Sequence, residues 1–264
     1  MKRKIIAALL SLSMGLSLVA CADTGSVDES AAEPVTLTVL AAASLTDVMG
    51  EIETAYETSH PNVDLVFSFA SSGDLQAQIE NGAPADVFIS AAAKQMNALN
   101  EEGLMNSDSI IDLLQNKVVL IVPADSTIGL DSFEDVLSDS VTMIGLGEPE
   151  SVPAGKYAQQ IFETLGIWED VQARANFGTD VRTVLSWVEA GEVSCGVVYA
   201  TDAFTTDLVT IVAEAPEGSC DDVIYPAGIV AASSNADASA EFIAYLQGAD
   251  AAASFESYGF TMVG

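Results

Sequence analysis

The sequence predicts an α/β protein in which strands and helices alternate along most of the chain. Short runs rich in Val, Leu and Phe are each followed by a stretch in which apolar residues have helical spacing. The chain has 264 residues, of which 50% are hydrophobic, so it can bury one large core or two medium lobes. The alternation indicates βαβ units, in which a parallel sheet carries helices on its faces.

The individual elements follow from this pattern. The first half contains three strand and helix pairs, at 35–43 and 44–59, 63–70 and 72–82, and 86–91 and 93–103. Further strands are predicted at 117–124, 142–149, 195–200, 210–216 and 224–232. Further helices are predicted at 154–166 and 179–191, and one or two more at 240–260.

The N-terminal residues have the composition of a targeting segment. Lys2, Arg3 and Lys4 precede the apolar run IIAALLSLSMGLSLVA, which is short for a membrane span and ends in small residues. The next residue is Cys21, and LVAC resembles the bacterial lipobox, which implies cleavage before Cys21 and a lipid on that cysteine. The alternative is an ordinary signal peptide that is cleaved nearby. Both interpretations place the mature protein outside the cytoplasm.

We therefore expect a signal peptide at 1–20 and, because residues 21–34 are small and polar, a flexible tether there. The formal charge is −31, with 39 acidic residues against 8 Lys and Arg. Cleavage removes three cations and no acid, so the charge becomes −34. Such acidity argues against nucleic acid or an anionic membrane surface as a partner. It favours solubility, with a cationic partner as the alternative.

Small or hydroxyl residues stand at four junctions that lead into helices: AAASLTD, ASSGD, EPESVPAGKYA and GTDVR. Ser44, Ser71 or Ser72, and Thr179 or Asp180 can cap three of these helices. Ligands of open α/β sheets bind at the carboxyl ends of strands, where helix N-termini offer unpaired amides and about half a positive charge. Four such termini in one cleft would hold an anion without any cation. The alternative is that each hydroxyl only caps its helix.

Other chemistry has few candidate residues. His60 is the only histidine, so a Ser-His-Asp triad is not expected. Zinc is disfavoured as well, because Cys195 and Cys220 lack the usual ligand spacing. Outside the cytoplasm a disulfide between these two cysteines is expected, with two free thiols as the alternative.

Six motifs follow one another along the chain: AAASLTDVM, FASSGDLQAQIENGAPADVFISA, GEPESVPAGKYA, DVRTVLSWVEAGEVSCGVVYATDA, YPAGIV and YGF. Together they resemble the periplasmic molybdate-binding protein of ABC transporters, and the resemblance runs from about Val35 to Phe260. The resemblance implies a two-lobed periplasmic-binding-protein fold of type II, with the ligand cleft between the lobes. We expect lobe one at 35–117 plus 227–264 and lobe two at 118–226.

The resemblance also implies an oxyanion site built from hydroxyl and amide donors. The serine of AAASL is Ser44 and the second serine of FASS is Ser72, and each offers its hydroxyl and its amide. The alanine of VPAG, Ala154, and the valine of DVR, Val181, offer their amides. The tyrosine of GVVYATDA, Tyr199, offers its phenolic hydroxyl. These residues are implied contacts of the oxyanion and not direct metal ligands. The resemblance implies neither a cofactor nor an enzymatic activity, so the chain is not expected to be an enzyme.

The implied function is that of a monomeric lipoprotein on the outer face of the cell membrane, which delivers molybdate or tungstate to the membrane permease of an ABC importer. Arg182 and Lys156, the basic residues nearest the implied contacts, are expected to stay out of the site. The alternative, suggested by charge alone, is an acidic extracellular protein that binds cations or another surface. Asp221 and Asp222 are its candidate residues, although they lack the spacing of a calcium loop.

Overall fold

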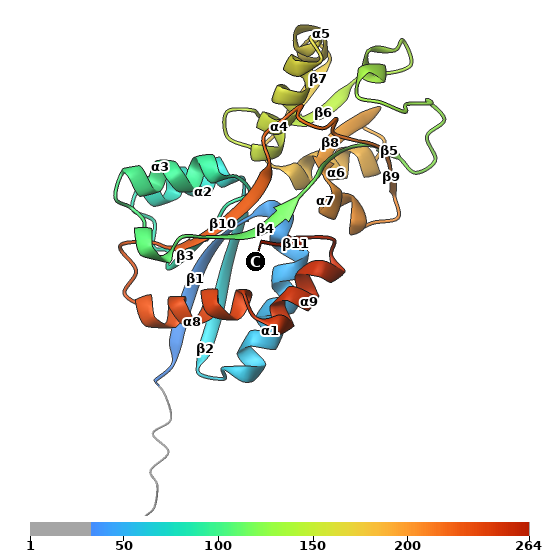
Figure 1. Ribbon diagram of the computed structural model, residues 1–264. Coiled ribbons are helices and arrows are strands. Elements are labelled where there is room, and N and C mark those ends of the chain that lie inside the picture. The colour runs from blue at the N-terminus through green and yellow to red at the C-terminus, as the bar shows by residue number, and fades with distance from the viewer. Residues whose placement is uncertain (1–32, 264) are drawn as a thin grey trace, which may run out of the picture. The chain divides into compact units, whose positions relative to one another are not determined.

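The structure is a computed structural model that describes residues 33–263 and contains two β-sheets. The first sheet has six strands in the spatial order β11 (Thr261–Met262), β4 (Ile111–Asn116), β10 (Val223–Ile229), β3 (Val87–Ile89), β1 (Val35–Ala42) and β2 (Val63–Ala70). The second has five strands in the order β7 (Ala175–Gly178), β6 (Ile144–Gly147), β8 (Cys195–Tyr199), β5 (Val118–Pro123) and β9 (Val209–Glu214). We call each sheet, together with the helices that pack on it, the first lobe and the second lobe (Figure 1).

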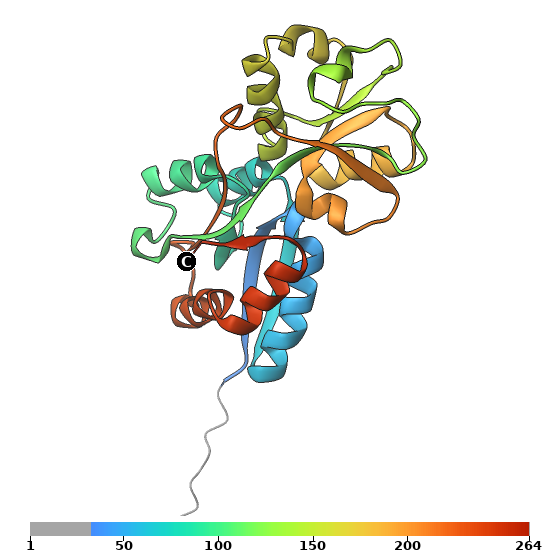
Figure 2. The same cartoon turned by 45° about the vertical axis from the view of Figure 1, so that its right-hand side comes forward.

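Helices cover both faces of the first sheet. One face carries α1 (Thr46–Ser59), α8 (Ala236–Leu246) and α9 (Ala249–Ser257), and Figure 2 shows α1 and α9 side by side. The other face carries α2 (Ser72–Glu80) and α3 (Ala93–Glu101). Within β1, Val39 packs into one core while Leu40 packs into the other with Leu75 and Met96. Burial on both faces explains why residues 39–42 of this strand are all apolar.

The second sheet is also covered by helices. They are α4 (Pro153–Thr164), α5 (Trp168–Gln172), α6 (Val181–Glu189) and α7 (Ala200–Phe204). Val184 and Val188 of α6 have no exposed surface and pack against β6 and β8. Three short 3-10 helices complete the described chain, at η1 (Ala43–Leu45), η2 (Ser107–Ser109) and η3 (Glu134–Leu137).

The α/β prediction is confirmed, but the prediction of parallel sheets is only partly right. Strands β1, β2 and β3 run parallel, as do β6, β7 and β8. In contrast, β10 is antiparallel to β3 and β4, and β5 is antiparallel to β8 and β9. Each of these antiparallel pairs includes β5 or β10, the strands by which the chain enters the other sheet. No helix of the described chain precedes them as a crossover.

The chain crosses between the lobes at two neighbouring places. It leaves β4 at Asn116 and enters β5 at Val118, and it returns from β9 to β10 through residues 215–222. The amide of Ala215 donates to the carbonyl of Val118 at 2.9 Å, and Val223 pairs with Asn116. The expected boundary at 226/227 falls inside β10, which pairs with first-sheet strands over its length. We therefore propose lobes of 35–117 plus 223–263 and of 118–222.

The expected disulfide is not formed, because Cys195 and Cys220 are both free thiols. Cys195 lies fully buried in β8, whereas Cys220 is half-buried in the segment that returns to the first lobe. Burial raises the pKa of the Cys195 thiol to about 12, and burial together with Asp221 and Asp222 raises the pKa of Cys220. Both thiols are therefore protonated at neutral pH. The expectation was wrong because it was based only on a location outside the cytoplasm. A disulfide also requires a fold that brings the two sulfur atoms within bonding distance.

Several predictions concern the N-terminal part of the chain. The signal peptide at 1–20, the lipidation of Cys21 and all but the last two residues of the tether lie outside the described residues. Within 33–263, no helix combines the length and the apolar character that a membrane crossing requires.

Candidate functional site

A small cavity of about 10 Å³ lies between the lobes, and the five residues expected to contact an oxyanion all line it. Ser44 and Ser72 come from the first lobe, whereas Ala154, Val181 and Tyr199 come from the second. The remaining lining residues are small or apolar: Ala42, Ala43, Ala70, Ser71, Ala91, Val152 and Pro153. The structure therefore brings together residues that lie far apart in the sequence.

The beginnings of several helices surround this cavity. Ser44 lies in η1 directly before α1, Ser72 is the first residue of α2, Ala154 is the second of α4, and Val181 is the first of α6. Amides in the first turn of a helix have no carbonyl one turn earlier to bond with, and they carry a partial positive charge. The cavity consequently collects N–H donors from both lobes.

The two serines at the start of α2 have separate roles. Ser71 is the N-cap, and its hydroxyl accepts a hydrogen bond from the amide of Asp74 at 3.1 Å. The hydroxyl of Ser72 instead accepts from the amide of Ala91 at 2.9 Å. That bond uses a lone pair of the Ser72 oxygen, so the hydroxyl hydrogen remains able to donate into the cavity.

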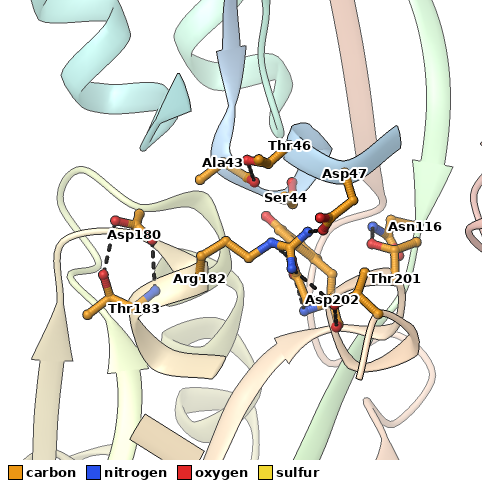
Figure 3. A network of polar contacts seen from close by, with 12 residues as sticks. Ala43, Ser44, Thr46, Asp47, Asn116, Asp180, Arg182, Thr183, Thr201 and Asp202 are labelled. Atoms are coloured by element: carbon orange, nitrogen blue, oxygen red, sulfur yellow. Dashed lines mark hydrogen bonds and ion pairs between the residues drawn. The ribbon is translucent and has the colours of Figure 1, made fainter. Parts of the chain in front are cut away.

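Ser44 does not cap the helix that follows it. The N-cap of α1 is Leu45, which makes no side-chain cap bond. The Ser44 hydroxyl lies 2.9 Å from the hydroxyl of Tyr225, and both side chains are buried. Thr46 donates to the carbonyl of Ala43 at 2.7 Å and so holds the turn that contains Ser44 (Figure 3).

Tight packing brings the start of α4 to the cavity. Pro153 occupies the first turn, where its missing N–H leaves no donor unpaired. A Cβ atom on Gly155 would lie 2.1 Å from the carbonyl oxygen of Gly147, so only glycine fits there. The helix can therefore approach the end of β6 closely, and this places Ala154 at the cavity wall.

The start of α6 is fixed by a side-chain cap. The Asp180 carboxylate accepts a hydrogen bond from the amide of Thr183 at 2.8 Å, as in the capping alternative for this junction. Because this cap uses the amide of Thr183, the amide of Val181 is not consumed by it. Val181 lines the cavity two residues before Thr183.

Tyr199 presents a buried hydroxyl that has no partner within the described part of the chain. Its side chain is 1% exposed, and the hydroxyl makes no hydrogen bond there. Burial, with Tyr225 and Tyr157 nearby, raises the pKa of Tyr199 well above its ordinary value, so the group remains a donor. A buried hydroxyl without a partner costs about 1–3 kcal/mol, which a ligand oxygen at this position would offset.

Arg182 follows Val181 but does not line the cavity. It forms an ion pair with Asp47 of α1, across the two lobes, and a second one with Asp202 of α7, in which Nε and Oδ1 are 3.1 Å apart (Figure 3). The second contact lacks hydrogen-bond geometry and is therefore ionic. Arg182 also donates to the hydroxyl of Thr205 at 3.1 Å.

Asp202 connects Arg182 to the strand end that carries Tyr199. Its Oδ2 accepts a hydrogen bond from the amide of Tyr199 at 3.2 Å. Burial raises the pKa of the Asp202 carboxyl to about 7, although the charge of Arg182 and the bond from Tyr199 lower it. Sequence analysis missed the roles of Asp47, Asp202 and Tyr225. The only local signal was that Asp47 and Asp202 are acidic residues in the first turn of a helix.

The arrangement can hold a fully ionised anion. None of the cavity-lining residues within 33–263 has a charged side chain, while hydroxyls and helix N-termini supply donors. Burial of a dianion without a counter-ion requires that its oxygens accept hydrogen bonds, and donors on rigid helix ends meet that need. The same described residues contain no cluster of three or more His, Cys, Asp or Glu that could hold a metal ion.

Comparison with known proteins identifies the family. Residues 37–261 match the bacterial extracellular solute-binding proteins. YvgL of Bacillus subtilis, named as a substrate-binding lipoprotein of an ABC transporter, is 39% identical over 96% of both chains. The molybdate-binding protein ModA of Haemophilus influenzae is 38% identical over 98% of this chain and 97% of its own. The periplasmic molybdate-binding protein of Azotobacter vinelandii has a similar fold, with a TM-score of 0.77 at 21% identity, over 85% of this chain and 98% of its own.

These relatives are solute-binding proteins of transporters, so the expectation that the chain is not an enzyme is confirmed. The expected periplasmic-binding-protein fold is confirmed as well. The chain belongs to the bacterial extracellular solute-binding proteins and is a homologue of the ModA molybdate-binding proteins.

Proposed function

We propose that the cavity captures molybdate or tungstate, and that Ser44, Ser72, Ala154, Val181 and Tyr199 donate hydrogen bonds to the oxyanion. The observation that carries this proposal is the Tyr199 hydroxyl, which is buried at the cavity without a partner among the described residues. A tetrahedral oxyanion accepts hydrogen bonds on all sides, so it can use donors from both lobes at once. Such a ligand would bridge the lobes and favour their closure.

The relatives support the choice of ligand class. ModA of H. influenzae is a molybdate-binding protein by name and matches nearly the whole chain. The five residues carried over from the motifs all line one cavity. Sequence similarity and the chemistry of the cavity-lining residues thus support the same class of ligand, an oxyanion.

The donor set also favours ions that carry no proton. Molybdate, tungstate and sulfate are unprotonated at neutral pH, whereas hydrogen phosphate brings a proton that needs an acceptor. The cavity size must then separate molybdate and tungstate from the smaller sulfate. Selection therefore has two parts, of which the first depends on the direction of each hydroxyl.

Family membership places the work of this protein outside the cytoplasm, together with a membrane permease. We infer that a lipid on Cys21 anchors it to the outer face of the membrane and that it acts as a monomer. The name of YvgL, a lipoprotein, supports the anchor. For the alternative of a cation binder, Asp221 and Asp222 were the candidates, but Asp221 accepts a hydrogen bond from Gln160 at 2.6 Å.

Titration calorimetry of the mature protein with molybdate, tungstate and calcium chloride tests the function. We expect both oxyanions to bind and calcium to give no binding heat. Tyr199→Phe removes the unpaired donor and should weaken molybdate binding by about tenfold or more. Tyr157→Phe is the matched control, because its hydroxyl donates to the carbonyl of Asp222 at 3.4 Å and does not line the cavity. Calcium binding without oxyanion binding would support the alternative instead.

A further inference from the structure

Behind the cavity, buried hydrogen bonds connect Asn116, Tyr225 and Ser44. The Nδ2 atom of Asn116 donates to the Tyr225 hydroxyl at 3.2 Å, and this hydroxyl lies 2.9 Å from that of Ser44. The three residues are 7%, 0% and 4% exposed, respectively. Of the three residues, only Ser44 lines the cavity, so the hydrogen bonds of Tyr225 and Asn116 connect to a ligand through Ser44.

The backbone fixes the direction of these bonds. Because a backbone amide can only donate, the Asn116 atom that faces the amide of Lys117 at 2.8 Å must be the side-chain oxygen. The NH₂ group of Asn116 therefore faces Tyr225, and its other hydrogen goes to the hydroxyl of Thr201 at 2.8 Å. Thr201 belongs to the second lobe, so contacts from both lobes hold this amide in place.

The direction continues to the serine. The Tyr225 oxygen accepts from Asn116, and the hydrogen of Tyr225 has the Ser44 oxygen as its partner. If Ser44 donated to Tyr225 instead, the hydrogen of Tyr225 would be buried without an acceptor, which is unfavourable. Burial also raises the pKa of Tyr225 well above its ordinary value, which keeps that hydrogen in place.

We propose that Asn116 and Tyr225 are positioning residues that fix the Ser44 hydroxyl as a donor toward the cavity. This inference rests on the proposed capture of an oxyanion. Since Tyr225 occupies a lone pair of Ser44, the serine hydrogen is directed to the ligand and its oxygen is less available to a proton on the ligand. The pair thereby contributes to selection of unprotonated tetrahedral dianions over protonated ones.

The test compares two competitors of similar size that differ by one proton. Sulfate and hydrogen phosphate are titrated at pH 8 against bound molybdate, in the wild-type protein, in Tyr225→Phe and in the control Tyr157→Phe. Loss of the Tyr225 hydroxyl frees the Ser44 oxygen to accept. We expect the affinity for hydrogen phosphate relative to sulfate to rise about tenfold in Tyr225→Phe, and to stay unchanged in Tyr157→Phe.

A second variant provides the same test if Tyr225→Phe does not fold. In Asn116→Asp the carboxylate still accepts from the amide of Lys117 but cannot donate to Tyr225, so we expect the relative affinity to change in the same direction. An unchanged ratio in the folded variants, or no displacement of molybdate by hydrogen phosphate from them, overturns the inference. A wild-type protein that binds no molybdate contradicts the proposed function itself.

Discussion

The amide of Gly73, in α2 of the first lobe, donates a hydrogen bond to the carbonyl of Ser151 in the second lobe at 2.9 Å. The two backbones touch, since a Cβ atom on Gly73 would lie 2.5 Å from the Ser151 oxygen and 2.7 Å from its Cα. Both residues adjoin the cavity, because Ser72 and Val152 line it. This contact therefore closes the lobes beside the site and requires glycine at position 73.

We expect Gly73→Ala to weaken molybdate binding by at least about tenfold, mainly through faster dissociation. The added methyl group collides with backbone, which cannot move aside as a flexible side chain can, so the lobes cannot approach to the same distance. Gly50→Ala in α1 is the control, because nothing lies within 4 Å of its added Cβ atom. Stopped-flow measurement of release decides, and equal dissociation rates in the two variants would show that closure does not depend on this contact.

Removal of a serine hydroxyl should weaken oxyanion binding by about 1.5–3 kcal/mol, because a charged oxygen loses a donor in a buried site. This applies to Ser44→Ala and to Ser72→Ala, measured by calorimetry with molybdate. Ser254→Ala serves as the control, since that exposed hydroxyl donates to Glu51 at 2.9 Å and is not a lining residue of the cavity. Binding within a few tenths of a kcal/mol of wild type in both variants would refute the site.

The sequence predicts the local features of the site better than its connections. Ser71 and Asp180 cap their helices, and both were among the predicted cap residues. Such a prediction is possible because a cap depends on residues within one turn. Ser44 does not cap, because the partner of its hydroxyl is Tyr225, which is far away in the sequence. Local patterns carry no information on such a partner.

The same limit applies to the fold. The strand at Ile111–Asn116 was not predicted, because IIDLLQN has no clear alternation and its place depends on pairing with β10. The antiparallel strands of the two sheets were not predicted either, because strand direction depends on how the chain crosses between the lobes. The five contacts could be placed only through motifs shared with a family, and not from hydropathy or spacing.

Arg182→Gln should reduce molybdate affinity less than Ser72→Ala does. Arg182 does not line the cavity, and its ion pair with Asp47 is partly exposed, for which about 0–1 kcal/mol is usual. The loss should appear in the dissociation rate, because the pair joins the two lobes. Lys117→Gln is the matched control, since it breaks an exposed ion pair with Glu214 and changes the charge equally. A larger loss than in Ser72→Ala would mean that the charge of Arg182 attracts the ligand.

Asp202 should make stability depend on pH. Its carboxyl has a pKa of about 7 in the folded protein, raised mainly by burial from an ordinary value of 3.8. The folded protein therefore holds a proton here that the unfolded chain has lost, and this contribution to stability is present at low pH and lost as the pH rises through about 7. Relative to Asp202→Asn, the wild type should lose thermal stability between pH 5 and pH 8. A constant difference in melting temperature would contradict this.

The negative charge of the protein repels the anionic ligand that it is proposed to capture. The mature chain has a formal charge of −34, from 39 acidic residues and the five Lys and Arg that follow the signal peptide. The nearest basic side chains are already engaged, since Lys156 donates to Gln159 at 3.0 Å and Arg182 pairs with Asp47 and Asp202. A dianion that approaches the cavity therefore meets net repulsion.

Salt should accelerate capture for this reason. Charges farther apart than about 8 Å are largely screened at physiological ionic strength, whereas the buried donors around the bound ion are screened much less. We expect the association rate for molybdate to rise when an inert salt increases from about 0.01 M to 0.15 M, with a smaller effect on dissociation. Stopped-flow fluorescence of Trp168 and Trp187 measures both rates. A rate that falls with salt would mean that the cavity entrance is locally positive, and Lys156 and Arg182 would then have to steer the ligand.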